Sequence, residues 1–250
     1  MNDIIIEYKE VKKAFGKQFA LDGLSFSIKS KEFVALVGNN GSGKTTTIKT
    51  LCNLIPYDNG SIIIFKRKVT PLYVSYRSKI GVFLSEPILI NDFTPVEYLK
   101  FICKFQGIEA NNCQSRITEI LDLFSIQNLD RKKIINYSSG DKVKISLAAS
   151  LIHNPDLLIL DEPFIHLDFL SLEKILNILL SLKGRKTLFI TSHNLEAIHS
   201  LCERILIIDE GKIIDDISYS NKLSNKSLKE VVKSKLKNLE NSSETPLWLS

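Results

Sequence analysis

Gly38-Asn39-Asn40-Gly41-Ser42-Gly43-Lys44-Thr45 is the stretch that decides the fold of this chain. It has the form G-x-x-x-x-G-K-S/T, a glycine-rich loop that holds nucleotide phosphates. Glycines let successive backbone N–H groups turn toward an anion, and the N-terminus of a following helix adds its positive dipole end. In such a loop the Lys44 ammonium reaches the β- and γ-phosphates, and the Thr45 hydroxyl ligates Mg²⁺. We therefore predict a nucleotide site with Mg²⁺.

The sequence on either side of the loop fits the strand, loop and helix that such a site requires. Residues 33–37 are a short continuous apolar run, as expected for a strand buried on both faces. After the loop, apolar residues recur at helical spacing, at Ile48, Leu51, Cys52 and Ile55. A glycine-rich turn without chemistry is the alternative interpretation, and this pattern counts against it.

Composition points to an ordinary globular protein. The chain has 250 residues, enough for one large domain or two small ones, and 44% of them are hydrophobic. No apolar run approaches the length of about 18 residues typical of a membrane span, and the N-terminus lacks a signal-peptide pattern, so we expect a cytoplasmic location. The four cysteines are scattered without a C-x-x-C pair, which predicts buried, reduced thiols rather than a zinc site.

The net charge of +5 has a local origin, because lysines outnumber acids from Lys212 onward. Residues 217–250 are expected to form an accessory basic helix or tail, with apolar positions at Leu228, Val231, Val232, Leu236 and Leu239. A nucleic-acid-binding protein would show a broader basic face, so we expect no nucleic-acid partner. A solvated helix face is the favoured interpretation, and attraction to an anionic membrane surface is the alternative.

Apolar runs alternate with helical patterns along most of the chain, which predicts an α/β fold. Apolar stripes between 91 and 154 indicate an inserted helical lobe, and its first helix begins with the capping box Thr94-Pro95-Val96-Glu97 and continues through Val96, Leu99, Ile102 and Phe105. Strands that alternate with helices predict a mainly parallel sheet with its ligand at the carboxyl ends of the strands. The expected strands are residues 4–8, 24–28, 33–37, 61–65, 80–84, 157–160, 188–190 and 205–208.

Two of these strands end in residues suited to phosphate chemistry. Asp161 and Glu162 follow the apolar run 157–160, where Asp161 would hold Mg²⁺ and Glu162 would accept a proton from an attacking water. His193 follows the next strand, within reach of a γ-phosphate. Taken singly, each acid could be a solvated strand end and the histidine could be structural.

Together these motifs resemble the ATP-binding cassette of ABC transporters over residues 1–216. The distinguishing stretch is 137–141, Tyr-Ser-Ser-Gly-Asp, which resembles the family signature L-S-G-G-Q. It stands ahead of 154–163, which is close to the family's Walker B motif. In the same comparison Leu167-Asp168 resembles the end of the D-loop, His193 falls at the switch histidine, and Phe15 falls at the aromatic residue that stacks on adenine. From position alone, Phe15 would instead be a core aromatic.

The resemblance implies a P-loop NTPase core with a mainly parallel sheet, an inserted helical subdomain at about 91–154 and an N-terminal antiparallel β portion. It implies ATP and Mg²⁺ as cofactors, with hydrolysis in a homodimer or heterodimer that sandwiches two ATP molecules. Catalysis is assigned to Glu162, His193 and Lys44, and the metal to Thr45, Asp161 and Ser85. The nucleotide is assigned to Phe15, Gly38, Asn39, Asn40, Gly41, Ser42, Gly43, Lys44, Thr45, Thr46, Ser138 and Gly140.

The implied partners are transmembrane permease subunits on separate chains, which would place the protein peripherally on the inner face of the cell membrane. We expect the lobe near 86–113 to meet that partner, with Phe93, Tyr98 and Phe101 as candidate anchors. The general pattern is most similar to the exporter-like group. The alternatives are a regulatory cassette with little turnover and a soluble cassette protein acting on ribosomes or DNA.

Three stretches depart from the family pattern. At the Q-loop the register gives Ser85, with Glu86 next, and either residue could contact Mg²⁺ and the attacking water. Ser139 and Asp141 replace a glycine and the glutamine of the signature, and we expect Asp141 to point away from the phosphate. The D-loop stretch 164–166, Phe-Ile-His, is bulkier than usual. The main catalytic residues are all present, so hydrolysis should survive.

Overall fold

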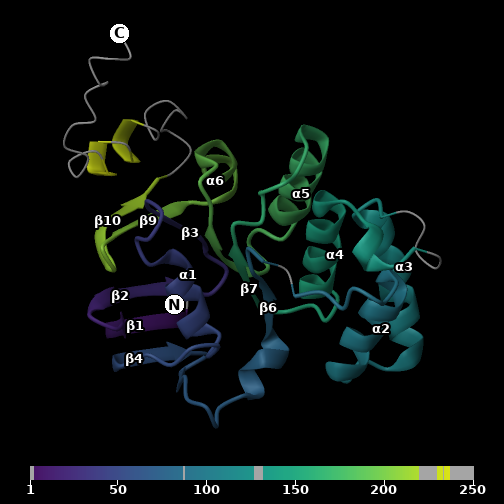
Figure 1. The fold of residues 1–250 in the computed structure, drawn as a ribbon, viewed down its shortest axis with the longest axis horizontal. Coiled ribbons are helices and arrows are strands. Elements are labelled where there is room, and N and C mark those ends of the chain that lie inside the picture. Colours follow the sequence, from purple (N-terminus) through teal and green to yellow (C-terminus); the bar gives the residue numbers. More distant parts are fainter. Residues whose placement is uncertain (1–2, 87, 127–131, 220–229, 233, 237–250) are drawn as a thin grey trace.

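A computed structural model describes residues 3–86, 88–126, 132–219, 230–232 and 234–236. The chain forms two sheets and a helical lobe, which lies on the right of Figure 1 and packs against β6 (Ile80–Phe83) through α4 (Ser139–Leu151). The N-terminal sheet has four antiparallel strands in the order β2-β1-β4-β5. Its strands are β1 (Ile4–Phe15), β2 (Gln18–Lys29), β4 (Asn59–Ile64) and β5 (Arg67–Lys68).

The central sheet has six strands in the order β10-β9-β3-β8-β7-β6. All neighbours are parallel except β10, which pairs antiparallel with β9 at the edge. Every residue of β3, β7 and β8 is buried, which explains why these strands are continuous apolar runs in the sequence. The bounds are β3 (Phe33–Val37), β6 (Ile80–Phe83), β7 (Leu157–Asp161), β8 (Thr187–Thr191), β9 (Arg204–Asp209) and β10 (Lys212–Ser218).

The helices labelled α1 to α6 lie between residues 44 and 201. Helices α1, α5 and α6 belong to the core, whereas α2, α3 and α4 form the lobe (Figure 1). The bounds are α1 (Lys44–Leu51), α2 (Pro95–Phe105), α3 (Ala110–Leu123), α4 (Ser139–Leu151), α5 (Phe169–Ser181) and α6 (Leu195–Leu201). Two short 3₁₀ helices, η1 (Ser75–Lys79) and η2 (Ile134–Asn136), precede β6 and α4.

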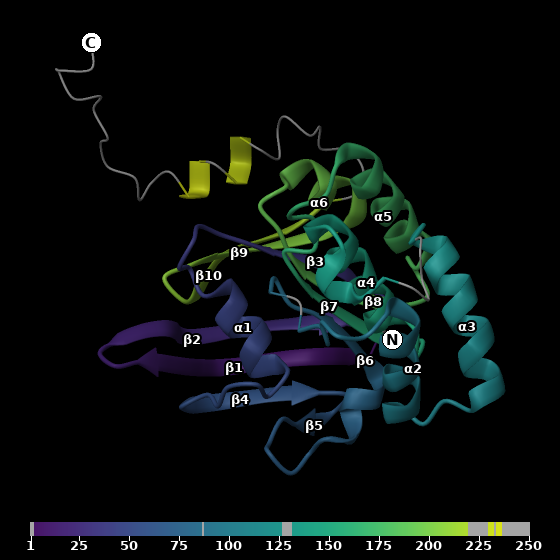
Figure 2. The ribbon, with the colours of Figure 1, turned by 45° about the vertical axis from the view of Figure 1, so that its right-hand side comes forward.

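Aromatic residues join the two sheets beneath the phosphate loop. The rings of Tyr8 and Phe26 stack at 4.6 Å, and Phe26 contacts Phe189 of β8 at 5.7 Å. The Tyr8 hydroxyl also donates to the carbonyl of Thr47 at 2.7 Å, which ties α1 to the N-terminal sheet, as its position between the sheets in Figure 2 suggests. The helix that begins at the phosphate loop is therefore anchored to the N-terminal sheet.

The predicted α/β class, parallel sheet, helical insertion and antiparallel N-terminal portion are confirmed. The capping box of α2 is also confirmed, because Thr94 Oγ1 accepts from the N–H of Glu97 at 3.2 Å and Glu97 Oε2 accepts from the N–H of Thr94 at 2.7 Å. The inclusion of Phe105 in the apolar stripe is wrong, since this side chain is 77% exposed at the end of α2.

Two further details of the sequence interpretation are corrected. Helix α1 ends at Leu51, because Asn53 adopts a left-handed conformation with φ of 54° and Leu54 donates back to Lys49, so Ile55 lies beyond the helix. Strand β10 was not expected, and its residues alternate between exposed and half-buried, as in an edge strand. The expected limit of the cassette at 216 falls inside β10, and the division into cassette and tail stays a prediction.

Part of the expected C-terminal helix can be placed. Residues 230–232 and 234–236 are helical, Val232 is buried against the core, and Lys235 pairs with Asp215 at 3.0 Å. Leu228 and Leu239 lie outside the described residues. The four cysteines are free and buried, as predicted. Within the described ranges, no helix is long and apolar enough to span a bilayer.

Candidate functional site

The phosphate loop lies between β3 and α1, at the carboxyl edge of the parallel sheet. Its glycines are required by close approach: a Cβ on Gly38 would lie 2.2 Å from the carbonyl oxygen of Ile208, and one on Gly43 would lie 2.5 Å from that of Ala20. Gly43 also has a φ of 111°, a conformation that side chains disfavour. Helix α1 begins at the next residue, so its N-terminus opens into a cavity of about 290 Å³ beside the loop.

The Lys44 side chain is folded over the loop. It is only 7% exposed, and its ammonium donates to the carbonyls of Gly38 at 2.8 Å and Asn39 at 2.9 Å. Burial lowers its pKa, and the carboxylates of Glu162 and Asp161 oppose this effect. Ser42 Oγ is buried nearby without a hydrogen-bond partner among the described residues. A cation and an unpartnered hydroxyl beside backbone N–H groups make a site suited to an anion.

Asp161 is the centre of a hydroxyl cluster at the end of β7. The residue is fully buried, and its Oδ1 accepts a 2.6 Å hydrogen bond from Thr191 Oγ1. Its Oδ2 accepts from Thr45 at 3.1 Å and from Ser85 at 3.3 Å. The structure thus brings together Thr45, Asp161 and Ser85, the residues expected at the metal. Ser85 and its alternative Glu86 are both exposed, and it is Ser85 that contacts Asp161.

Glu162 and His193 face each other across the same cavity. Glu162 Oε1 lies 3.1 Å from His193 Nε2, and its Oε2 accepts from the backbone N–H of His193 at 3.1 Å. Burial raises the pKa of Glu162, while His193 and Lys44 act in the opposite direction. His193 thus contacts both carboxylate oxygens of Glu162, and both residues line the cavity together with Lys44.

Phe15 ends β1 and is not a core residue. Its side chain is 56% exposed, so the alternative interpretation from position alone is wrong. The ammonium of Lys13 lies 5.5 Å from the centre of its ring. An exposed aromatic ring on the hairpin that precedes the phosphate loop provides a face for a base to stack on.

The signature residues belong to a different surface. Ser138 caps α4, accepting from the N–H of Asp141 at 3.1 Å and donating to its Oδ2 at 2.8 Å. Asp141 also pairs with Lys144 at 3.2 Å, so its carboxylate is engaged within the helix. Of the described residues that line the phosphate cavity, none comes from α4. Ser138 and Gly140 therefore lie outside the phosphate cavity of their own chain.

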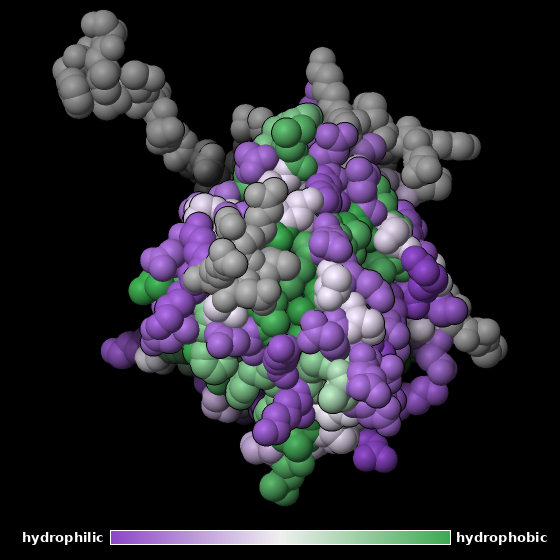
Figure 3. All heavy atoms as spheres, turned by 90° about the vertical axis from the view of Figure 1, so that its right-hand side faces the viewer, coloured by the Kyte–Doolittle hydropathy of each residue, from purple (hydrophilic) through white to green (hydrophobic). Residues whose placement is uncertain are grey.

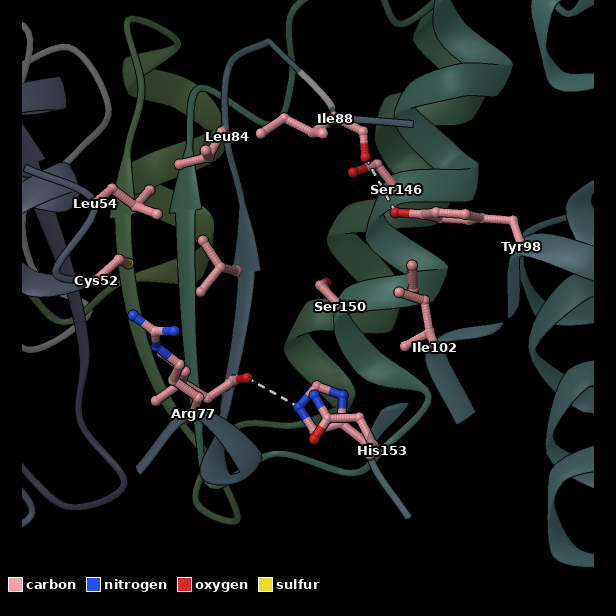
Figure 4. Close-up of a pocket in the computed structure, with 14 residues that line it drawn as sticks. Cys52, Leu54, Arg77, Leu84, Ile88, Tyr98, Ile102, Ser146, Ser150 and His153 are labelled. Atoms are coloured by element: carbon pink, nitrogen blue, oxygen red, sulfur yellow. Dashed lines mark hydrogen bonds between the residues drawn. The ribbon is translucent and has the colours of Figure 1, made fainter. Parts of the chain in front are cut away.

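A second pocket of about 350 Å³ lies between β6 and the lobe helices α2 and α4 (Figure 4). On its lobe side the Tyr98 hydroxyl donates to the carbonyl of Ile88 at 3.1 Å, and at its base His153 contacts the carbonyl of Ile80 at 2.9 Å. Tyr98, one of the candidate anchors, is only 8% exposed and forms a wall of this pocket, and its role as an anchor stays a prediction.

The other candidate anchors pack against each other on α2 and the segment before it. The rings of Phe93 and Phe101 meet edge to face at 6.3 Å, and Phe101 is 46% exposed. Seen from the lobe side, apolar side chains form a group at the centre of a largely polar face (Figure 3). Exposed apolar residues of the lobe are Phe101, Phe105, Leu123 and Ile135.

Two residues of the site were missed by sequence reasoning. Thr191 joins Asp161 to Glu162, because its hydroxyl donates to the first carboxylate and accepts the N–H of the second residue at 3.1 Å. Its position at the end of a strand, ahead of His193, was the available signal. Ile165 lines the phosphate cavity with an apolar side chain, and nothing in its type suggested this.

Comparison with known proteins decides the family. The family model described as ABC transporter matches residues 21–165. The linearmycin resistance ATP-binding protein LnrL of Bacillus subtilis (strain 168) is 35% identical over 211 residues, which is 84% of this chain and 68% of that protein. This chain belongs to the ABC transporter family.

Other comparisons agree with this assignment. The Nod factor export ATP-binding protein I of Burkholderia orbicola (strain AU 1054) is 35% identical over 210 residues, covering 84% of this chain and 69% of that protein. A solved dimeric bacterial ABC transporter cassette superposes with a TM-score of 0.79 at 25% identity, covering 86% of this chain and 98% of that one. The protein is an ABC transporter ATP-binding subunit and an ATPase of this family.

Proposed function

We propose that this cassette binds Mg²⁺-ATP between Phe15 and the phosphate loop and hydrolyses it with Glu162 as general base. The observation that supports this most directly is the convergence of Lys44, Glu162 and His193 on one cavity at the N-terminus of α1. Lys44 exchanges its bonds to loop carbonyls for bonds to the β- and γ-phosphates. Glu162 takes a proton from the attacking water, and His193 holds its carboxylate in place.

The residues around Asp161 fit a magnesium ion. Mg²⁺ prefers oxygen ligands and usually takes one or two carboxylates, with the remaining positions filled by phosphate and water. Thr45, Asp161 and Ser85 supply one carboxylate and two hydroxyls. Bound there, the ion would neutralise charge on the phosphates.

The catalytic unit is a dimer of cassettes, either two copies of this chain or this chain with another. Ser138 and the N-terminus of α4 lie outside their own phosphate cavity, so they are free to close on an ATP molecule held by the opposite cassette. A two-fold arrangement then completes both sites at once. The dimeric cassette of the same fold supports this arrangement.

Transmembrane subunits on separate chains are the proposed partners, which places the protein on the inner face of the cell membrane. The pocket between β6 and α4 in Figure 4 suits their attachment, because it is bounded by both the core and the lobe. A rotation of the lobe would move one wall of this pocket. Export is the favoured direction, because one relative is named as an export protein.

The experiment that tests this function is sedimentation of Glu162→Gln with and without Mg²⁺-ATP. The amide keeps the shape of the side chain but cannot take a proton, so turnover should fall by roughly 10²- to 10⁴-fold. The variant should accumulate as an ATP-bound dimer, and adding Ser138→Arg should return it to a monomer that still binds ATP. Mg²⁺-ADP serves as the control ligand and should give monomer throughout.

A Glu162→Gln protein that stays monomeric at saturating ATP, alone and with its membrane partner present, would contradict the dimer. Near-zero turnover by the parent protein under the same conditions would favour the regulatory alternative. Recovery of the native protein with ribosomes, and none with membranes, would favour the ribosome-associated alternative.

A further inference from the structure

We propose that Lys13 and Asp58 form a clamp that positions Phe15 for the adenine base. This inference rests on the proposed function, in which the Phe15 ring stacks on the base. Neither residue is expected to touch the nucleotide. They are positioning residues that determine where the stacking ring is held relative to the phosphate loop.

Phe15 needs such support because of where it lies. It is the last residue of β1, and Gly16 follows in a turn with φ of 63° that leads to β2. This turn projects at the left end of the N-terminal sheet in Figure 2. A ring that is 56% exposed at the tip of a hairpin has little packing to hold it. An unsupported ring would lose side-chain entropy on stacking with a base.

Lys13 supplies a contact from within the protein. It lies two residues before Phe15 in β1, and the pairing with β2 shifts register between Lys13 and Ala14. Its side chain is only 11% exposed, which is unusual for a lysine. The ammonium lies 5.5 Å from the centre of the Phe15 ring, within cation–π range, and 2.9 Å from Asp58 Oδ1.

Asp58 fixes the backbone next to Phe15. Its Oδ2 accepts a hydrogen bond from the N–H of Ala14 at 2.7 Å, and its own N–H donates to the carbonyl of Lys12 at 2.8 Å. The Ala14 bond and Lys13 both lower the pKa of Asp58, so it is charged at neutral pH. Pairing between β1 and β4 ends at Lys12 and Asn59. The Asp58 side chain therefore extends that pairing by two residues, to Ala14, which directly precedes Phe15.

The clamp also joins the two ends of the nucleotide site. Asp58 lies in the short segment that follows α1, and α1 begins at the phosphate loop. The same segment thus connects the helix that faces the phosphates with the strand end that presents Phe15. The clamp thereby holds the ring in place relative to the loop before ATP arrives, which is the kind of preorganisation that raises affinity.

The test compares Lys13→Met with Lys12→Met, a control in which the neighbouring lysine of the same strand receives the same substitution. Lys12 is the adjacent residue of β1, pairs with Asp22 at 3.3 Å and lies 5.8 Å from the Phe19 ring, but it is more exposed and does not contact Phe15. Calorimetry would measure the affinity of each variant for Mg²⁺-ATP and for Mg²⁺-tripolyphosphate. The second ligand occupies the phosphate loop without a base.

Stacking of one base on an aromatic side chain is worth roughly 5- to 150-fold in affinity, and the clamp should account for part of this. Lys13→Met should therefore lower the affinity for ATP about fivefold or more and leave the affinity for tripolyphosphate unchanged. Lys12→Met should change neither affinity. In a Phe15→Ala background, Lys13→Met should have no further effect on ATP. Asp58→Asn, which keeps the side-chain shape but removes the charge, should act in the same direction and substitutes for Lys13→Met if that variant does not fold.

The outcomes separate the two hypotheses. The clamp would be overturned if Lys13→Met lost affinity for ATP and for tripolyphosphate equally, or if the folded variant kept its full affinity for ATP. Phe15 would keep its role in either case. An undiminished ATP affinity in Phe15→Ala would overturn the stacking role itself, and the clamp with it. Failure of the parent protein to bind either ligand would reject the nucleotide site as a whole.

Discussion

Replacement of Thr191 by valine is expected to destabilise the protein mainly through loss of the hydrogen bond that its hydroxyl donates to Asp161. Valine has nearly the shape of threonine, so the change opens no cavity at this fully buried position. It removes the 2.6 Å bond to Asp161 Oδ1, whose other donor, Thr45, lies at 3.4 Å. The N–H of Glu162 keeps a partner, because it also donates to the backbone carbonyl of Thr191 at 3.0 Å.

The magnitude follows from the charge of the acceptor. Hydrogen bonds to charged groups contribute about 1.5–3 kcal/mol, and a buried carboxylate that loses its shortest donor belongs in this range. For a chain of this size, each 1 kcal/mol corresponds to about 2–4 °C in melting temperature, so a loss of about 2 kcal/mol predicts a decrease of about 4–8 °C. Thr191→Ser keeps the hydroxyl and loses one methyl group, which costs about 1 kcal/mol.

The assay is thermal unfolding followed by circular dichroism, at pH 7.5 with a chelator so that no metal binds Asp161. The parent protein should be the most stable, the serine variant intermediate and the valine variant the least stable. A valine variant as stable as the serine variant would refute the reasoning, because it would show that the methyl group, and not the hydroxyl, stabilises this strand end.

Two further predictions concern the same cavity. Lys44→Ala should lower the affinity for ATP and for tripolyphosphate alike by at least about tenfold, because it removes a charged donor to phosphate. Calorimetry measures both affinities, and unchanged values would reject the site assignment. Burial raises the pKa of Glu162 above its ordinary value of 4.5, so its ionised form lowers the stability of the folded state once the pH passes that value. Glu162→Gln should accordingly be more stable than the parent at pH 7–8, with the gain shrinking as pH falls toward 4.5; a gain independent of pH in urea denaturation would contradict this cause.

The parts of the molecule that could be predicted from the sequence are those that depend on residues close together in the chain. The phosphate loop needs its glycines within a few residues of Lys44, and the capping box of α2 needs only Thr94 and Glu97. Buried strands such as β3 and β7 are continuous apolar runs because both of their faces are covered. In each case the physical cause acts within one element, so a single sequence is enough to identify it.

The parts that were missed depend on residues that are distant in the sequence. Thr191 meets Asp161 across 30 residues, because β7 and β8 pair in parallel with these two residues opposite each other. Asp58 meets Ala14 across 44 residues. The type of each residue was unremarkable, since threonine at a strand end and aspartate in a turn are both common. Only the register of the strands gives these side chains a role.

Phe15 shows how the two kinds of information combine. Its sequence position, between two apolar strands, was compatible with a core residue, and only the resemblance to a family suggested a stacking role. The fold explains why the ring is exposed: β1 extends beyond the predicted end at residue 8 to Phe15, which is its last residue before the hairpin turn at Gly16. An exposed ring held from inside the protein by Lys13 is an arrangement that a hydrophobic core would not produce. Its exposure and its support together are therefore better explained by a ligand than by packing.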